Sequence, residues 1–186
     1  MKKNIGRAEI LEYRRHMLEN ASGSILEIGI GTGLNLNLYP DDITEITAID
    51  PLVRKLPISK ISVKLYPDSA EKLHFEDNTF DTVVSTFTLC SIPNIDIALA
   101  EIARVLKPNG QFIFLEHGRA TSEFIRSIQV LANPFFNLLA YGCNITRNYE
   151  EALNNAGFIL NKYKIYRASI FPKEIAGYLH EGVAKK

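Results

Sequence analysis

The sequence predicts a single α/β domain, built as a doubly wound, mainly parallel, seven-stranded sheet. Short apolar and β-branched runs bounded by glycine, proline or aspartate alternate with segments of helical period. A length of 186 residues is about that of one domain. The content of 46% apolar and 23% charged residues is typical of a globular chain. In such sheets ligands bind beyond the carboxyl ends of the strands, so the residues that close each strand are the candidates for function.

Seven segments have the character of strands. They are predicted at 24–29, 43–50, 61–66, 80–86, 111–116, 158–168 and 176–183. Because strands alternate with helices, right-handed crossovers should place helices on both faces of one sheet. No internal repeat or linker indicates a second domain, so residues 1–186 are taken as one unit.

Helices are predicted between these strands. They span 7–20, a brief stretch at 34–38, Asn94 to Leu106, and 147–155 with a stop at Gly157, and a further apolar segment at 124–141 is broken at Asn133-Pro134. The helix after Asn94 has the strongest signal, since Asn94 can cap its N-terminus and apolar residues recur at steps of three and four. Residues 107–110 supply its stop.

Charge and hydropathy limit the partners of this chain. Lys and Arg total 21, as do Asp and Glu, so a nucleic-acid partner is not expected, although a local basic patch stays possible. No apolar run approaches the roughly 20 residues of a membrane-spanning helix. A charged segment at 9–19 stands where a signal peptide would be apolar. We therefore expect a cytoplasmic protein without a stable membrane anchor.

Cysteine and histidine spacing predicts no metal site. Cys90 and Cys143 are 53 positions apart, which fits neither a CxxC pair nor a structural zinc motif. The four histidines are scattered, and none pairs with another at the i, i+4 spacing of a helical metal site. Reduced thiols are the expectation.

A glycine-rich loop closes the first strand, with the sequence Glu27-Ile28-Gly29-Ile30-Gly31-Thr32-Gly33. Glycines allow unusual backbone angles and let a ligand approach the main chain. A dinucleotide fingerprint would need its third glycine at position 34, where Leu34 stands, and no Gly-Lys-Ser/Thr of a P-loop follows. A nicotinamide-dependent oxidoreductase is therefore disfavoured.

Asp50 ends the second strand, seventeen residues beyond Gly33. Its two carboxylate oxygens can each accept a hydrogen bond from a ribose diol. The order of loop and acid indicates a nucleoside ligand. The alternative is a tight strand–helix turn followed by a surface aspartate.

The chain resembles the class I S-adenosylmethionine-dependent methyltransferases, whose first motif is an acidic residue followed by G-x-G-x-G. The resemblance continues through 69–75, 80–84 and 104–110. It implies S-adenosylmethionine as cofactor, with its amino-acid part near the glycine loop, its ribose held by Asp50 and its adenine beside Ser69 and Ala70. Ser69 stands where many relatives have aspartate, and Asp68 precedes it. The expected cofactor-binding residues are Glu27, Gly29, Gly31, Gly33, Asn35, Asp50, Pro51, Ser69, Ala70 and Thr86.

A narrower resemblance concerns the methyltransferase-like 7 group of small-molecule thiol S-methyltransferases. It rests on 88–91, 115–117, 133–134, 142–147 and 156–158. It implies a small, largely apolar acceptor, with a thiol favoured. Members of that group in animals begin with a membrane-anchoring helix, which we do not expect for this protein. O-, N- or C-methylation of a phenol, quinone precursor or lipid headgroup stays open, as does a non-catalytic module that only binds the cofactor.

Several residues near the strand ends have two possible roles. A free thiol is only a few per cent thiolate at neutral pH, so His117 is the candidate base, or else a histidine that shapes the strand end. Glu116 either orients His117 or caps a neighbouring helix. Arg147 could stabilise an anionic acceptor, but a role in holding its loop is favoured. Cys90 and Cys143 could be catalytic thiols, but packing is favoured for both.

Two further features could cover the acceptor. Tyr13 could lie over the cofactor or belong to the core. The apolar segment 124–141 could form a lid over an apolar acceptor pocket or pack on the sheet. An interfacial membrane contact is disfavoured because Arg126 is its single basic residue.

Overall fold

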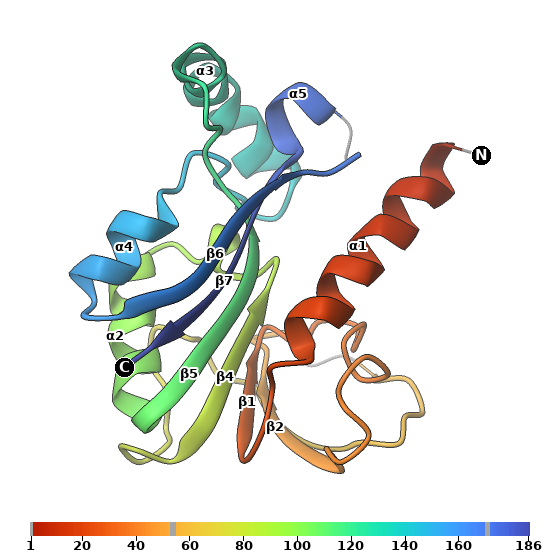
Figure 1. The fold of residues 1–186 in the computed structure, drawn as a ribbon, viewed down its shortest axis with the longest axis vertical. Coiled ribbons are helices and arrows are strands. Elements are labelled where there is room, and N and C mark those ends of the chain that lie inside the picture. Colours follow the sequence, from red (N-terminus) through yellow and green to blue (C-terminus); the bar gives the residue numbers. More distant parts are fainter. Residues whose placement is uncertain (1, 53–54, 170–171) are drawn as a thin grey trace.

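The computed structural model describes residues 2–52, 55–169 and 172–186, which form one seven-stranded sheet flanked by helices (Figure 1). The strands are β1 (Ile25–Ile28), β2 (Glu45–Ile49), β3 (Ser62–Tyr66), β4 (Phe80–Thr86), β5 (Leu106–His117), β6 (Ile159–Arg167) and β7 (Tyr178–Lys185). Their order in the sheet is β3-β2-β1-β4-β5-β7-β6. The first five run parallel, and β7 lies antiparallel between β5 and β6. The predicted doubly wound α/β fold is confirmed.

The helices cover both faces of this sheet. They are α1 (Lys2–Leu18), the 3₁₀ turn η1 (Leu89–Ser91), α2 (Ile95–Val105), α3 (Glu123–Leu139), α4 (Tyr149–Asn155) and α5 (Lys173–Ala176). In Figure 1, α2 and α4 lie on one side and α1 on the other, while α3 and α5 extend beyond one end of the sheet. In the part of the chain that the structure describes, no helix has the length and apolarity needed to cross a membrane.

The register of the central strands brings their carboxyl ends to one edge. Ile28 of β1 pairs with Ile49 of β2 and with Ser85 of β4. The residues that follow these positions therefore emerge side by side, which places the glycine loop between Asp50 and Thr86. Parallel pairing is thus what assembles the candidate site.

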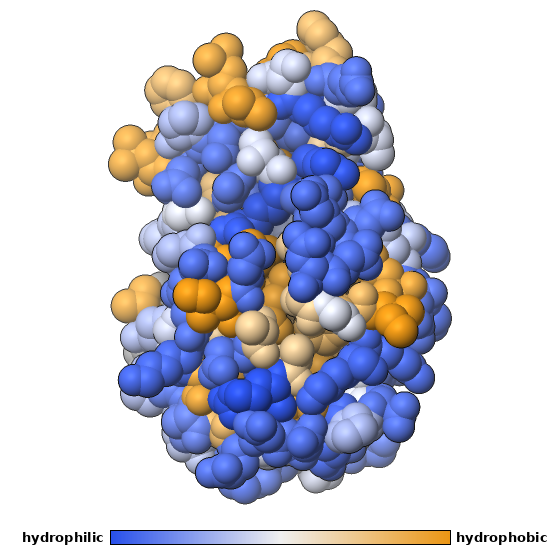
Figure 2. All heavy atoms as spheres, turned by 90° about the vertical axis from the view of Figure 1, so that its left-hand side faces the viewer, coloured by the Kyte–Doolittle hydropathy of each residue, from blue (hydrophilic) through white to orange (hydrophobic). Residues whose placement is uncertain are grey.

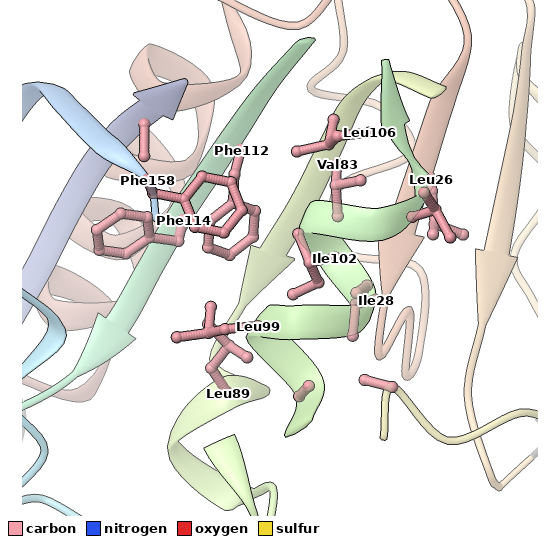
Figure 3. Close-up of a cluster of buried hydrophobic side chains, with 14 of the residues drawn as sticks. Leu26, Ile28, Val83, Leu89, Leu99, Ile102, Leu106, Phe112, Phe114 and Phe158 are labelled. Carbon is pink, nitrogen blue, oxygen red and sulfur yellow. The ribbon is translucent and has the colours of Figure 1, made fainter. Parts of the chain in front are cut away.

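Two apolar clusters fill the space between sheet and helices. Leu26 and Ile28 of β1 belong to the cluster beneath α2 and α4, which Figure 3 shows with Leu99 and Ile102 of α2. Ile25 belongs to the cluster on the α1 side. Because side chains alternate along a strand, Glu27 points to the α1 side as well. Full burial of each large apolar side chain contributes about 1.5–3 kcal/mol.

The helix predicted after Asn94 forms as expected. The Asn94 side-chain oxygen accepts the backbone N–H of Ile97 at 3.2 Å, so it caps α2. Strand β5 then begins at Leu106 and is longer than predicted, because residues 106–110 join it through the pair Phe80–Leu106 and a register shift. Asn109 takes a positive φ of 66° there, which asparagine tolerates.

Two predictions about helices were wrong, and one short helix was not predicted. Helix α3 continues through Pro134. Proline has no N–H to donate to the carbonyl of Val130, and because Val130 is 65% exposed, water can take the place of that donor. Residues 34–38 form turns, closed by bonds such as Leu36 N–H to Gly33 carbonyl at 3.2 Å, because Gly33 has a positive φ of 75°. The four-residue helix α5 was not predicted.

Candidate active site

A cavity of about 570 Å³ opens at the carboxyl edge of the sheet. This volume falls within the roughly 300–1,000 Å³ of small-molecule sites. Seven of the ten residues expected to bind the cofactor line the cavity: Gly29, Gly31, Asp50, Pro51, Ser69, Ala70 and Thr86. The other three, Glu27, Gly33 and Asn35, lie behind its wall.

The glycine loop presents its backbone to this cavity. Gly31 has a φ of 55°, and a Cβ added there would meet only the carbonyl oxygen of Gly29, at 4.0 Å. The space before Gly31 is therefore open to a ligand. Gly29 is required for packing instead, since a Cβ would lie 2.3 Å from the Thr88 side chain. At Gly33 an added Cβ would lie 2.8 Å from Leu36.

Asp50 is oriented by two backbone hydrogen bonds. Its Oδ2 accepts the N–H of Gly31 and its Oδ1 accepts the N–H of Leu52, each at 2.8 Å. Each carboxylate oxygen retains a further lone pair for a ligand hydroxyl. The arrangement fits a vicinal diol such as that of ribose.

Glu27 and Asn35 form a buried polar layer behind the loop. Glu27 Oε1 accepts from the Asn35 amide at 3.0 Å, and Oε2 accepts from the Tyr39 hydroxyl at 2.8 Å. Complete burial raises the pKa of Glu27 to about 7, against the lowering effect of these hydrogen bonds. Both side chains are therefore bound to other buried polar groups and do not line the cavity.

Arg14 of α1 reaches into this polar layer and lines the cavity. Its Nη1 donates to Asn35 Oδ1 at 2.7 Å and to Thr86 Oγ1 at 2.8 Å. The side chain is 7% exposed, and its Nε has no hydrogen-bond partner among the described residues. Burial lowers the pKa of Arg14, while the neighbouring Glu27 raises it. The sequence did not single out Arg14, because a lone arginine in a charged helix is usually a surface residue.

Tyr13, the residue considered as a cover for the cofactor, points elsewhere. Its ring stacks on Tyr166 of β6 with 4.4 Å between centroids, and its hydroxyl donates to Glu9 at 2.9 Å. Tyr13 does not line the cavity, whereas the adjacent residue Arg14 does.

The departure at Ser69 leaves a carboxylate in the cavity wall. Asp68 and Ser69 both line the cavity. Asp68 is paired with His74, while Ser69 Oγ accepts the N–H of Glu71 at 3.2 Å. Acidic character at this wall therefore comes from Asp68 and Glu71.

Glu116 acts on the loop that follows β4. It is completely buried, and its carboxylate accepts the backbone N–H groups of Thr88, Leu89 and Cys90 at 3.0, 3.0 and 3.1 Å. The Ser85 hydroxyl donates a fourth bond at 2.8 Å. Burial raises the pKa of Glu116, against these bonds. Of its two predicted roles, the structure shows capping, here of η1.

His117 and the two cysteines meet beside the cavity. His117 Nδ1 lies 3.7 Å from Cys143 Sγ and 4.0 Å from Cys90 Sγ. The half-buried imidazole packs on Phe87, with 4.8 Å between ring centroids. Phe87, Ser91 and Tyr141 line the cavity, and the cluster lies directly behind them.

Both thiols are buried, as expected for packing residues, yet their surroundings differ. The neighbouring Cys90, His117 and Arg147 lower the pKa of Cys143, whereas the neighbouring Cys143 and burial raise the pKa of Cys90. Sequence spacing could not reveal this cluster, because its members are 26 and 27 positions from His117. The available signal was their common position after strand ends and in connecting loops.

Arg147 holds the connections around this cluster. Its Nε donates to the carbonyl of Cys90 at 3.4 Å, and its Nη2 donates to the carbonyl of Ile92. This is the loop-holding role that the sequence favoured.

Helix α3 leaves most of its apolar side chains exposed. The most exposed, between 65% and 81%, are Phe124, Val130, Leu131, Phe135, Leu138 and Leu139. Figure 2 shows apolar side chains gathered at the upper end of the molecule, where α3 lies. Gln129 is its buried residue and is held by three hydrogen bonds, to Ala120, Gly118 and Ile175. Packing on the sheet therefore does not account for this apolar surface. Tyr141, two residues after the end of α3, lines the cavity.

The strand order and the glycine loop beside an acidic strand end define a class I S-adenosylmethionine-dependent methyltransferase fold. Residues 26–114 match the family described as methyltransferase domain, and the chain belongs to this methyltransferase family. It is similar to a solved S-adenosylmethionine-dependent methyltransferase from Thermotoga maritima, a possible histamine N-methyltransferase. The TM-score is 0.69 at 21% identity, covering 98% of this chain and 91% of that one.

Two curated relatives are methyltransferases that differ in the atom they methylate. Human thiol S-methyltransferase TMT1A is 37% identical over 146 residues, covering 73% of this chain and 59% of the relative. The ubiquinone/menaquinone biosynthesis C-methyltransferase UbiE of Rickettsia felis is 31% identical over 149 residues, covering 76% and 60%. The chain thus spans about three fifths of the length of these relatives.

Proposed function

We propose that the protein transfers the methyl group of S-adenosylmethionine to the thiol of a small, largely apolar acceptor. The products are a methyl thioether and S-adenosylhomocysteine. The observation that carries the choice of acceptor atom is the 37% identity with a thiol S-methyltransferase. The cavity at the carboxyl edge of the sheet, with apolar Ile28, Ile92 and Phe87 in its wall, supports a ligand of this kind.

The residues of the cavity fit the cofactor. Asp50 would hold the ribose hydroxyls, and the open backbone at Gly31 would lie against the amino-acid part. Arg14, a buried cation with an unpaired Nε, would bind the cofactor's carboxylate. The cofactor supplies a methyl group on a positively charged sulfur.

Methyl transfer is an in-line displacement, so the protein acts mainly by positioning and by excluding water. Phe87, Thr88 and Tyr141 line the cavity beside the end of β4 and would border the acceptor. The exposure of Tyr141 (91%) leaves it able to close over a bound acceptor. His117 lies behind this wall, so a base role requires the acceptor to reach past Phe87.

Turnover with a panel of acceptors tests the proposal. The protein is incubated with S-adenosylmethionine and hexanethiol, thiophenol, phenol, hexylamine or a quinone precursor, and products are identified by mass spectrometry. We expect thioethers from both thiols and at least tenfold slower reaction of phenol than of thiophenol. Turnover confined to oxygen, nitrogen or carbon acceptors would overturn the thiol assignment.

A second candidate is C-methylation of a quinone precursor, which the 31% identity with UbiE favours. It predicts product from the quinone precursor alone. A non-catalytic cofactor-binding module would instead bind S-adenosylmethionine in a calorimeter and give no product with any member of the panel.

A further inference from the structure

Three donor atoms, two thiol sulfurs and one imidazole nitrogen, converge from three separate segments behind the residues that line the cavity. They are Cys90 Sγ in η1, His117 Nδ1 at the end of β5 and Cys143 Sγ in the loop after α3. All three atoms lie within 4.8 Å of one another. Chain segments far apart in sequence thus present one compact set of ligands.

The spacing of these atoms is close to that of a tetrahedral zinc site. Zn–S bonds of about 2.3 Å and Zn–N bonds of about 2.0–2.1 Å imply edges of roughly 3.8 Å between two sulfurs and roughly 3.6 Å between sulfur and nitrogen. The distances from His117 Nδ1 are 3.7 Å to Cys143 Sγ and 4.0 Å to Cys90 Sγ. These two distances exceed the expected edge by a few tenths of an ångström at most. The two sulfurs lie within 4.8 Å of each other and would approach by up to about 1 Å on binding the metal.

The surroundings hold the ligands from behind. The Cys90 N–H is bound by Glu116 at 3.1 Å, and the Cys90 carbonyl accepts the N–H of Asn144, next to Cys143, at 2.7 Å. The Tyr149 hydroxyl donates to the His117 carbonyl at 3.0 Å. Main-chain anchoring of this kind fixes ligand positions before a metal arrives.

Charge also favours a divalent cation here. Two thiolates and a neutral imidazole bring two negative charges, which one Zn²⁺ neutralises in a buried place where uncompensated charge is costly. Soft thiolate ligands select zinc over magnesium or calcium.

We propose that Cys90, Cys143 and His117 bind one Zn²⁺ and leave its fourth position to the thiolate of the methyl acceptor. Sites with three protein ligands of the Cys₂His type keep such a position for water or substrate. Cys90, His117 and Cys143 do not line the cavity, whereas Phe87, Ser91 and Tyr141 do, so the acceptor would have to pass between these three residues to reach the metal. The acceptor part of this inference rests on the proposed thiol S-methyltransferase function.

The chemistry balances without an oxidant or reductant. The acceptor thiol gives its proton to solvent as it binds, because a thiol bound to zinc is deprotonated. Its sulfur lone pair then forms the new S–CH₃ bond, and the electron pair of the broken S–CH₃ bond returns to the sulfonium sulfur of the cofactor. His117 then serves as a ligand through Nδ1 and not as a base.

Metal content and a Co²⁺ titration test the site on the full chain, kept reduced with a phosphine. We expect one zinc per chain and, with Co²⁺, the charge-transfer absorption of cobalt–thiolate bonds. Co²⁺ binding should weaken at least tenfold in each of the variants Cys143→Ser, Cys90→Ser and His117→Asn. It should not change in the control variant His16→Gln, because His16 is an exposed residue. The wild-type titration and a metal-dependent rise in melting temperature test the site without relying on the folding of a cysteine variant.

The fourth position is tested by adding hexanethiol or hexanol to the Co²⁺-loaded protein. We expect the cobalt spectrum to change with the thiol and not with the alcohol. An absence of bound metal, a Cys90–Cys143 disulfide under the same reducing conditions, or a spectrum indifferent to hexanethiol would overturn the inference.

The outcomes separate this inference from the proposed function. Full thiol turnover after removal of metal by a chelator would overturn the zinc role and leave thiol methylation standing. A thiol-dependent cobalt spectrum without methyl transfer to any thiol would support the metal site and overturn the proposed function.

Discussion

Removing the carboxylate of Asp50 should sharply weaken cofactor binding. Its two oxygens are held by the N–H groups of Gly31 and Leu52, both at 2.8 Å, with further lone pairs for the two ribose hydroxyls. A hydrogen bond to a charged group contributes about 1.5–3 kcal/mol. Asp50→Ala should thus lose about 3–6 kcal/mol, which is a factor of roughly 10² to 10⁴ in Kd.

The Asp50→Asn variant sharpens this expectation. Asparagine keeps one acceptor oxygen, but its amide NH₂ cannot accept from the second backbone N–H. We therefore expect a loss of affinity between zero and that of Asp50→Ala. Calorimetric titration with S-adenosylmethionine at fixed pH and salt gives both affinities, with circular dichroism to confirm folding. Asp42→Asn, at an exposed position, is the matched control. Affinity of Asp50→Ala within threefold of the wild type would refute the assignment of Asp50 to the ribose.

Three further changes have expected outcomes. Asn94→Ala removes the cap of α2 and should lower the free energy of unfolding by about 1 kcal/mol in urea titrations; an unchanged midpoint would contradict the capping. Arg14→Met should weaken S-adenosylmethionine binding at least tenfold by calorimetry, whereas exposed Arg15→Met should not, and equal affinities would exclude a cofactor contact. Burial lowers the pKa of His180 to about 4, below the value of about 6.5 in the unfolded chain. Between these two pH values the imidazole binds a proton in the unfolded chain but not in the folded one, so the free energy of unfolding rises with pH over this range. The difference in unfolding free energy between wild type and His180→Gln should therefore increase by up to about 3 kcal/mol across that range, and a flat difference would refute it.

The part of the site nearest the strand ends could be predicted from sequence. Gly29, Gly31 and Asp50 directly follow β1 and β2, and parallel pairing brings such residues together whatever the details of the packing. The boundaries of most strands were predicted within two residues because short β-branched runs end at glycine or proline. Local pattern and strand order therefore determine this edge of the cavity.

The remaining parts depend on contacts that no local pattern encodes. Arg14 becomes a cavity residue only because α1 packs on the sheet and brings its side chain to Asn35 and Thr86. Cys90, His117 and Cys143 meet because η1, β5 and the loop after α3 converge, so the expectation of no metal site rested on spacing alone. The continuation of α3 through Pro134 depends on exposure to solvent, which the sequence does not state.

The carboxylate of Glu116 also has a consequence for the order of assembly. The loop of residues 88–90 gains its shape from a side chain 26 to 28 positions further along the chain. Strands β1 to β4 alone contain the glycine loop and Asp50, but they lack this anchor. Contacts between distant segments form late because they carry the largest loop-closure cost. During synthesis, the binding site should therefore become competent only after residues beyond 117 have left the ribosome and β5 has docked.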